Sequence, residues 1–206
     1  MWRVLVLCLC SGLLSCSEPA QVEFRNTNIS GVEIGSSLAA FKDHSGHAIT
    51  LDEFKGKAVV VFFGYTSCPD VCPTTLARLA ETMKRLGTEA ERVQVLMVTV
   101  DPEHDTPEKL AAYMTAFNPS FLGLYGDLPA TEAAARAFKV FVRAEPPAGH
   151  EHVHANANEA AAKPIQIDHS TGSYVFDPAG KIRLYVRDEA STDAIVSDLQ
   201  GLLTGL

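Results

Sequence analysis

The chain lacks several features that define common protein classes. Acidic residues outnumber basic ones by 25 to 17 among its 206 residues, and the formal net charge is −8. No basic run offers a footprint for phosphate groups, which argues against a nucleic-acid binder. After residue 16 no apolar stretch is long enough to span a bilayer, and no internal repeat occurs. Hydrophobic residues nevertheless make up 47% of the chain, enough for the core of one globular domain.

The first sixteen residues carry the pattern of an export signal. Arg3 precedes a short apolar core, and small residues follow it. This pattern predicts a signal peptide over residues 1–15. The segment Leu13–Cys16 also resembles the lipobox of bacterial lipoproteins, which implies that Cys16 carries the lipid and anchors the chain to a membrane, with the folded domain in the periplasm. Whether this is the outer or the inner membrane is left open, and an ordinary signal peptide with an incidental cysteine is the alternative.

Cysteine is scarce in the mature chain. Cys8 and Cys10 leave with the signal peptide and Cys16 is lipidated, so that only Cys68 and Cys72 remain. A disulfide between residues this close would close a loop too small to add much stability. Iron–sulfur clusters generally require four cysteines, so that class is excluded. We therefore expect the pair to be functional rather than a structural crosslink.

The hydrophobic pattern predicts one α/β domain over residues 34–206, preceded by a polar tether over 16–33. Strands alternate with helices, and a loop rich in Ala, Asn and His is inserted over 144–164. The expected elements are a hairpin over 41–51, strands over 58–63, 93–100, 173–176 and 182–186, and helices ending near Gly87, following Pro107, over 130–138 and over 191–203. A cysteine pair between a central strand and the next helix is the thioredoxin arrangement. We expect a thioredoxin-like fold with a central mixed sheet flanked by helices.

The spacing of Cys68 and Cys72 favours a metal over a disulfide. Residues four apart on a helix have Cβ atoms about 5–6 Å apart, whereas a disulfide needs about 3.5–4.5 Å. Two thiolates that each lie about 2.3 Å from one metal can be separated by nearly twice that distance. Pro69 and Pro73 do not fit together in one regular helix. If Pro73 is the first helical residue, Cys72 is the cap and oxidation of the pair remains possible.

A thiolate at the start of a helix is stabilised by unpaired amides and the helix dipole. We therefore expect a lowered pKa for the cysteines, which serves metal binding and redox exchange equally.

A two-sulfur site needs a further ligand, and His169 is the best placed of the seven histidines. It precedes the last hairpin, and the loop entering that region of a thioredoxin-like sheet faces the cysteine turn. Asp168 is a candidate hydrogen-bond partner for the imidazole; a solvated histidine is the alternative. Two thiolates and one imidazole form a soft site that selects copper, with zinc as competitor if water completes a tetrahedron.

Three segments in this order resemble the Sco/SenC family of copper-binding, thioredoxin-like proteins. They are Phe63–Leu76, Val100–Pro107 and Asp168–Ser170. The resemblance covers residues 34–204 and implies a metallochaperone that binds one Cu(I) or Cu(II) ion through Cys68, Cys72 and His169, with no organic cofactor. It further implies a monomer that helps assemble the CuA centre of cytochrome c oxidase subunit II or serves another copper-accepting protein, supplied by a periplasmic copper donor.

Other uses of these residues stay open. With Cys68 and Cys72 as a redox pair, the protein would be a thiol–disulfide oxidoreductase that keeps the cysteines of a copper protein reduced. A peroxidase is disfavoured, because peroxiredoxins have a threonine three residues before the reactive cysteine, where this chain has Tyr65. In the inserted loop, three alternate histidines form either a second metal site or part of a solvated loop; they are His150, His152 and His154.

Overall fold

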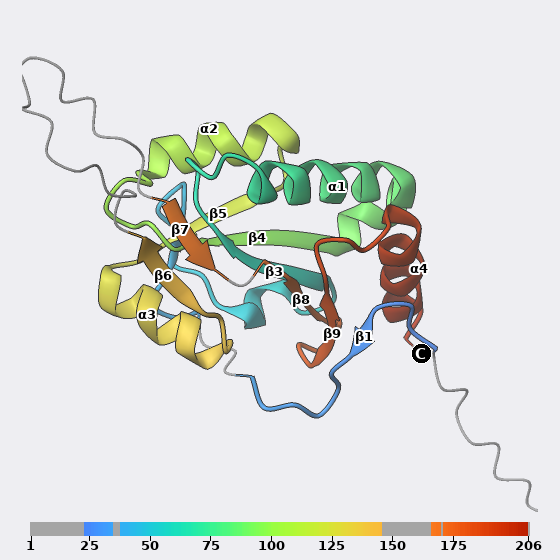
Figure 1. Ribbon diagram of the computed structural model, residues 1–206. Helices are drawn as coiled ribbons and strands as arrows, with labels where there is room; N and C mark the ends of the chain where they lie inside the picture. Colours follow the sequence, from blue (N-terminus) through green and yellow to red (C-terminus); the bar gives the residue numbers. More distant parts are fainter. Residues whose placement is uncertain (1–22, 35–37, 146–165, 170, 206) are drawn as a thin grey trace, which may run out of the picture.

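A seven-stranded mixed sheet forms the centre of the computed structural model, which describes residues 23–34, 38–145, 166–169 and 171–205 (Figure 1). The strands lie in the order β1 (Thr27–Asn28), β9 (Ile182–Val186), β8 (Ser173–Phe176), β3 (Ala58–Gly64), β4 (Val93–Thr99), β5 (Leu122–Tyr125) and β2 (Lys42–Asp43). β3 runs parallel to β4 and antiparallel to β8. Every residue of β3 and β4 is buried, as expected for central strands covered on both faces.

Helices cover both faces of the sheet. α1 (Val71–Leu86), α2 (Pro107–Phe117) and α4 (Thr192–Leu203) contribute their apolar sides to one core cluster. α3 (Leu128–Ala137) packs in a second core cluster, on the other face of β3. Apolar residues from the segment before β3, between positions 38 and 51, belong to the same cluster. Figure 1 shows α1 and α2 along one side of the sheet and α3 on the opposite side. Two 3-10 helices, η1 (Leu51–Phe54) and η2 (Gly87–Arg92), precede β3 and β4.

The thioredoxin-like α/β fold is confirmed, and so are the central strands, the last hairpin and the four helices. The predicted hairpin over 41–51 is confirmed as a short one, in which Lys42 forms an antiparallel bridge with Ala48. The Asp43 amide donates to the His47 carbonyl at 2.8 Å and the Ile49 amide to the Phe41 carbonyl at 3.0 Å. The Asp43 carboxylate accepts hydrogen bonds from the backbone of Ser45 and His47, which closes the chain into a tight turn. β2 also pairs with β5, which joins the hairpin to the edge of the central sheet.

Two segments differ from the predicted loop and tether. Ala144 and Glu145, expected in the inserted loop, end β6 (Val142–Glu145), which pairs with the unpredicted β7 (Gln166–His169) in a separate two-stranded sheet. Part of the expected tether is attached to the domain: the buried Asp198 carboxylate accepts hydrogen bonds from the backbone of Arg25 and Asn26.

Several predicted features lie outside the described residues. They are the signal peptide, Cys16, and the three loop histidines His150, His152 and His154. Among the helices that the structure does describe, none combines the length and the apolar character needed to cross a membrane.

Candidate metal centre

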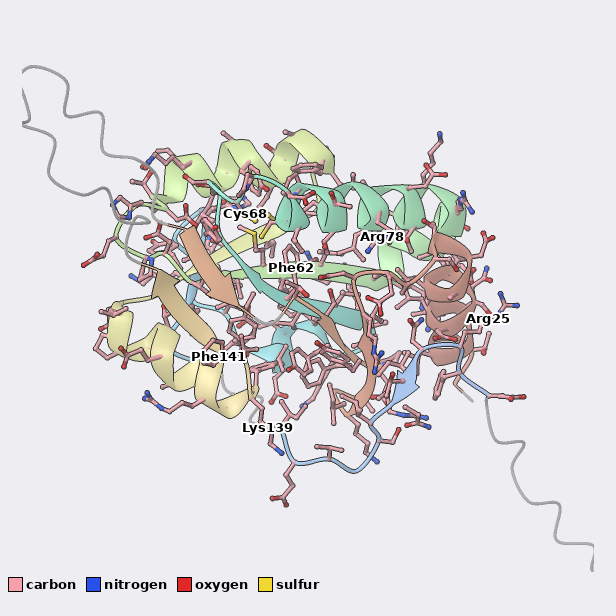
Figure 2. The ribbon with its side chains drawn as sticks, viewed as in Figure 1. Arg25, Phe62, Cys68, Arg78, Lys139 and Phe141 are labelled. Atoms are coloured by element: carbon pink, nitrogen blue, oxygen red, sulfur yellow. The ribbon has the colours of Figure 1, made fainter. Side chains whose placement is uncertain are left out.

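The two cysteines lie where β3 passes into α1. β3 ends at Gly64, and the Cys68 amide donates a hydrogen bond of 3.2 Å to the Tyr65 carbonyl, which closes a turn. α1 begins at Val71 with Asp70 as its N-cap, so Pro73 is not the first helical residue and Cys72 lies inside the first turn. Pro73 fits because backbone N–H groups in the first helical turn have no partner within the helix. Figure 2 shows Cys68 beside this first turn.

Both thiols are reduced and interact with each other. Cys72 is 1% exposed, whereas Cys68 is partly exposed. The hydrogen bond with Cys68 and burial raise the pKa of Cys72 well above its usual range, while a backbone hydrogen bond from Tyr65 opposes the shift. The predicted lowering of the pKa is therefore wrong for Cys72, because a buried thiolate loses its hydration and faces a second thiol. A metal or an oxidant has to displace protons from this pair.

Gly64 makes room for the Cys72 sulfur. A Cβ atom on Gly64 would lie 2.9 Å from Cys72 Sγ and 3.4 Å from Met97 Sδ. The first of these distances is too short for any real contact, so only glycine lets the thiol settle against the end of β3. We did not predict this role; a glycine that ends an apolar strand just before a cysteine motif is the signal that could have indicated it.

A buried carboxylate fixes the turn before the cysteines. Asp105 is 2% exposed and accepts hydrogen bonds from the Thr66 amide at 3.1 Å and from the Thr66 hydroxyl. It also accepts one from the Thr99 hydroxyl, at the end of β4, at 2.6 Å. Asp105 thus joins the cysteine turn to β4 and to the loop before α2. The sequence shows Asp105 within a family-like segment but gives no sign of these partners.

The same loop holds an exposed histidine close to a carboxylate. His104 Nδ1 lies 2.7 Å from Asp101 Oδ1, and this hydrogen bond raises the pKa of His104. The Asp101 amide donates a hydrogen bond of 3.0 Å to the Thr99 hydroxyl. The loop is therefore tied to the end of β4 at two points, through Asp101 and through Asp105.

His169 is the last residue of β7, where it pairs with Val142 of β6. β8 begins four residues later at Ser173, which lies opposite Phe62 of β3, close to the strand end that precedes the cysteines. The backbone thus returns from His169 to the end of the sheet that carries the thiols. The side chains of Asp168 and His169 are not described, and among the described side chains no three histidine, cysteine or acidic groups gather as a metal site.

Comparisons with known proteins agree with this arrangement. A family model described as SCO1/SenC matches residues 36–204. A SCO2-like protein from Rickettsia felis is 31% identical over 192 residues, which cover 92% of this chain and 87% of that protein. The solution structure of apo Sco1 from Thermus thermophilus is 34% identical, covers 89% of this chain and 99% of its own, and has a TM-score of 0.69. The structure of Bradyrhizobium japonicum ScoI with copper bound is 29% identical, covers 79% of this chain and 95% of its own, and has a TM-score of 0.66. The chain belongs to the SCO1/SenC family.

Proposed function

We propose that this protein is a copper metallochaperone that binds one copper ion, as Cu(I) or Cu(II), through Cys68, Cys72 and His169. The observation that carries the proposal is the pair of interacting, reduced thiols held at the junction of β3 and α1. Thiolate sulfur is a soft ligand that favours Cu(I) and zinc over hard cations. The B. japonicum relative with copper bound supports copper over zinc.

The third ligand rests on position in the fold. β7 ends at His169, and the chain continues into β8 beside the end of β3. An imidazole that approaches from this side would complete a three-coordinate copper site with the two sulfurs. It would leave Asp105 in place, whose carboxylate already accepts hydrogen bonds from Thr66 and Thr99.

The partial exposure of Cys68 suits delivery. Copper entering the site would meet Cys68 first, and the buried Cys72 would follow. Both thiols must lose their protons as copper binds, so copper release to an acceptor requires proton uptake by the pair or replacement of its sulfurs by the acceptor's own ligands. A ligand exchange of this kind needs one accessible sulfur and one that retains the ion, which this pair offers.

The acceptor and the location extend this proposal. Members of the SCO1/SenC family take part in copper assembly of cytochrome c oxidase, which supports the CuA centre of subunit II as the destination. A periplasmic copper donor would load the protein. The lipobox-like sequence at Cys16 supports a lipid anchor that holds the domain at the periplasmic side of a membrane.

Anaerobic transfer of copper tests the function directly. The Cu(I)-loaded protein is mixed with a reduced, metal-free CuA domain, the two are separated, and copper is measured in each. We expect copper to move to the CuA domain from the wild-type protein. A Cys68→Ser variant, whose preparation would carry less copper, serves as control. Retention of all copper by the wild-type protein, under conditions in which free Cu(I) loads the CuA domain, would contradict the proposal.

A second function, as a thiol–disulfide reductant, is favoured by the partial exposure of Cys68 beside a buried Cys72. The Cys68 thiolate would attack a disulfide of the target and release one target thiolate. Cys72, losing its proton, would then attack the mixed disulfide, leaving a Cys68–Cys72 disulfide and a dithiol target. A Cys72→Ser variant should trap the mixed disulfide, and His169→Ala should leave the exchange rate unchanged. Failure of the variant to form any mixed disulfide would rule this function out.

A further inference from the structure

One buried hydroxyl next to the cysteine loop has no partner. Among the described residues only two buried side-chain polar atoms lack a hydrogen bond, Tyr113 Oη and Thr131 Oγ1. Tyr113 lies on the inner side of α2, where its ring packs edge to face against Phe117 at 5.4 Å between centroids. A buried hydroxyl without a partner destabilises the fold, so its presence calls for a state in which it is used.

Tyr113 of α2 packs against the part of the core that also borders the Cys72 sulfur. α2 starts two residues after Asp105, whose carboxylate binds Thr66 in the turn before Cys68. Tyr113 packs against the core cluster that contains Phe62 and Met97. Cys72 Sγ, the Phe62 ring and Met97 Sδ all lie within 3.4 Å of the place that a Cβ on Gly64 would take, so the sulfur borders the same cluster. Burial raises the pKa of Tyr113 above its usual range, and the charges of Cys72, Cys68 and Asp105 add to the shift, with Cys72 the strongest of the three. The hydroxyl therefore lies in the same part of the core as the buried Cys72 sulfur and keeps its proton.

Copper binding changes what the sulfurs require. In the reduced, metal-free protein the two thiols hydrogen-bond to each other. When copper replaces their protons this hydrogen bond is lost, and Cys72 becomes a buried thiolate that can only accept. A hydrogen-bond donor in the same buried region then has a partner that it lacked before.

We propose that the Tyr113 hydroxyl donates a hydrogen bond to the Cys72 sulfur in the copper-loaded protein. This inference rests on the proposed copper site and adds Tyr113 to it as a positioning residue, which touches a ligand but not the metal. The bond stabilises the loaded state alone, because in the metal-free state the hydroxyl is unpaired. Tyr113 thus makes the domain favour copper at a small cost in the stability of the empty protein.

The test compares Tyr113→Phe with Thr131→Val in the full-length protein. Each change removes one unpaired buried hydroxyl and keeps the shape of the side chain, but Thr131 lies on α3, in the core cluster on the other side of the sheet. Thermal unfolding of the metal-free proteins, Cu(I) affinity by competition with a chelator, and the sulfur-to-Cu(II) absorption band are measured for both.

We expect neither variant to be less stable than the wild type when metal-free. Tyr113→Phe should bind Cu(I) about tenfold more weakly and shift the absorption band, as loss of a hydrogen bond to a charged acceptor implies. Thr131→Val should change neither. Wild-type affinity and an unshifted band in Tyr113→Phe would overturn the inference while leaving the copper site intact. Absence of one-to-one copper binding by the wild-type protein would instead refute the proposed function, and the inference with it.

Discussion

Replacing Asp105 by alanine should release the turn that precedes the cysteines. The carboxylate is almost fully buried and is the acceptor for the Thr66 amide, the Thr66 hydroxyl and the Thr99 hydroxyl. Thr99 is itself 0% exposed, so its hydroxyl cannot turn to water when the carboxylate is removed. Thr66 is only partly buried, and its hydroxyl can be solvated.

The expected cost follows from the groups left without an acceptor. A buried polar group that loses its partner costs about 1–3 kcal/mol. With the Thr99 hydroxyl and the Thr66 amide both affected, and a small void added, Asp105→Ala should lower the free energy of unfolding by about 3–5 kcal/mol. Asp105→Asn keeps one acceptor oxygen and should cost about 1–2 kcal/mol.

Urea unfolding of the metal-free protein at neutral pH measures this loss, and hydrogen exchange of the Thr66 amide locates it. Asp127→Ala is the control: this exposed carboxylate accepts a single hydrogen bond at the start of α3, and its loss should cost about 1 kcal/mol. The effects of Asp105→Ala and Thr99→Val should not add, because both remove the same hydrogen bond. An Asp105→Ala loss below about 1 kcal/mol, together with an unchanged exchange rate for Thr66, would refute the reasoning.

Three further predictions concern single contacts. Gly64→Ala should lower the free energy of unfolding by about 1–3 kcal/mol, because the alanine Cβ would displace the Cys72 sulfur. The Cu(I) affinity, measured by competition with a chelator, should fall as well, and wild-type affinity would contradict the steric argument. The interaction of His104 with Asp101 raises the pKa of His104, so its contribution to stability is present below about pH 6.5 and is lost as the pH rises through the folded-state pKa. His104→Gln should therefore destabilise the protein in urea at pH 5.5 more than at pH 8.5, and equal effects would speak against the interaction. Lys139 has a φ of 56°, so Lys139→Gly should raise the unfolding free energy by about 0.5–1 kcal/mol, and a decrease in the urea midpoint would show that the left-handed conformation is not strained.

The elements that the sequence predicted well are those with a strong local pattern. The continuous apolar runs of β3 and β4 are typical of strands that are buried on both faces, and the apolar residues of α1 recur at helical spacing. The last hairpin follows from the turn at Asp177, whose carbonyl accepts the Gly180 amide at 2.8 Å. In each case the pattern is set by residues within one element, so no distant partner was needed.

The missed features depend on residues far apart in the chain. The role of Asp105 exists only because Thr66 lies 39 positions earlier and is brought to it by the parallel pairing of β3 with β4. The pairing of β2 with β5, which follows much later in the chain, was likewise not predicted. The raised pKa of Cys72 has a local cause, the hydrogen bond with Cys68, and a long-range one, burial in the packed core, and together they outweigh the favourable start of α1.

Anaerobic titration with Cu(I), followed by oxidation and absorption spectroscopy, tests the three-ligand copper site most directly. The wild-type protein should bind one copper at the cysteine pair, and His169→Ala should bind it more weakly and with a changed Cu(II) absorption spectrum. His104→Gln, a change at a histidine outside the proposed ligand set, should match the wild type in both. Unchanged affinity and spectrum in His169→Ala would contradict the account and leave a site built from Cys68 and Cys72 without this histidine.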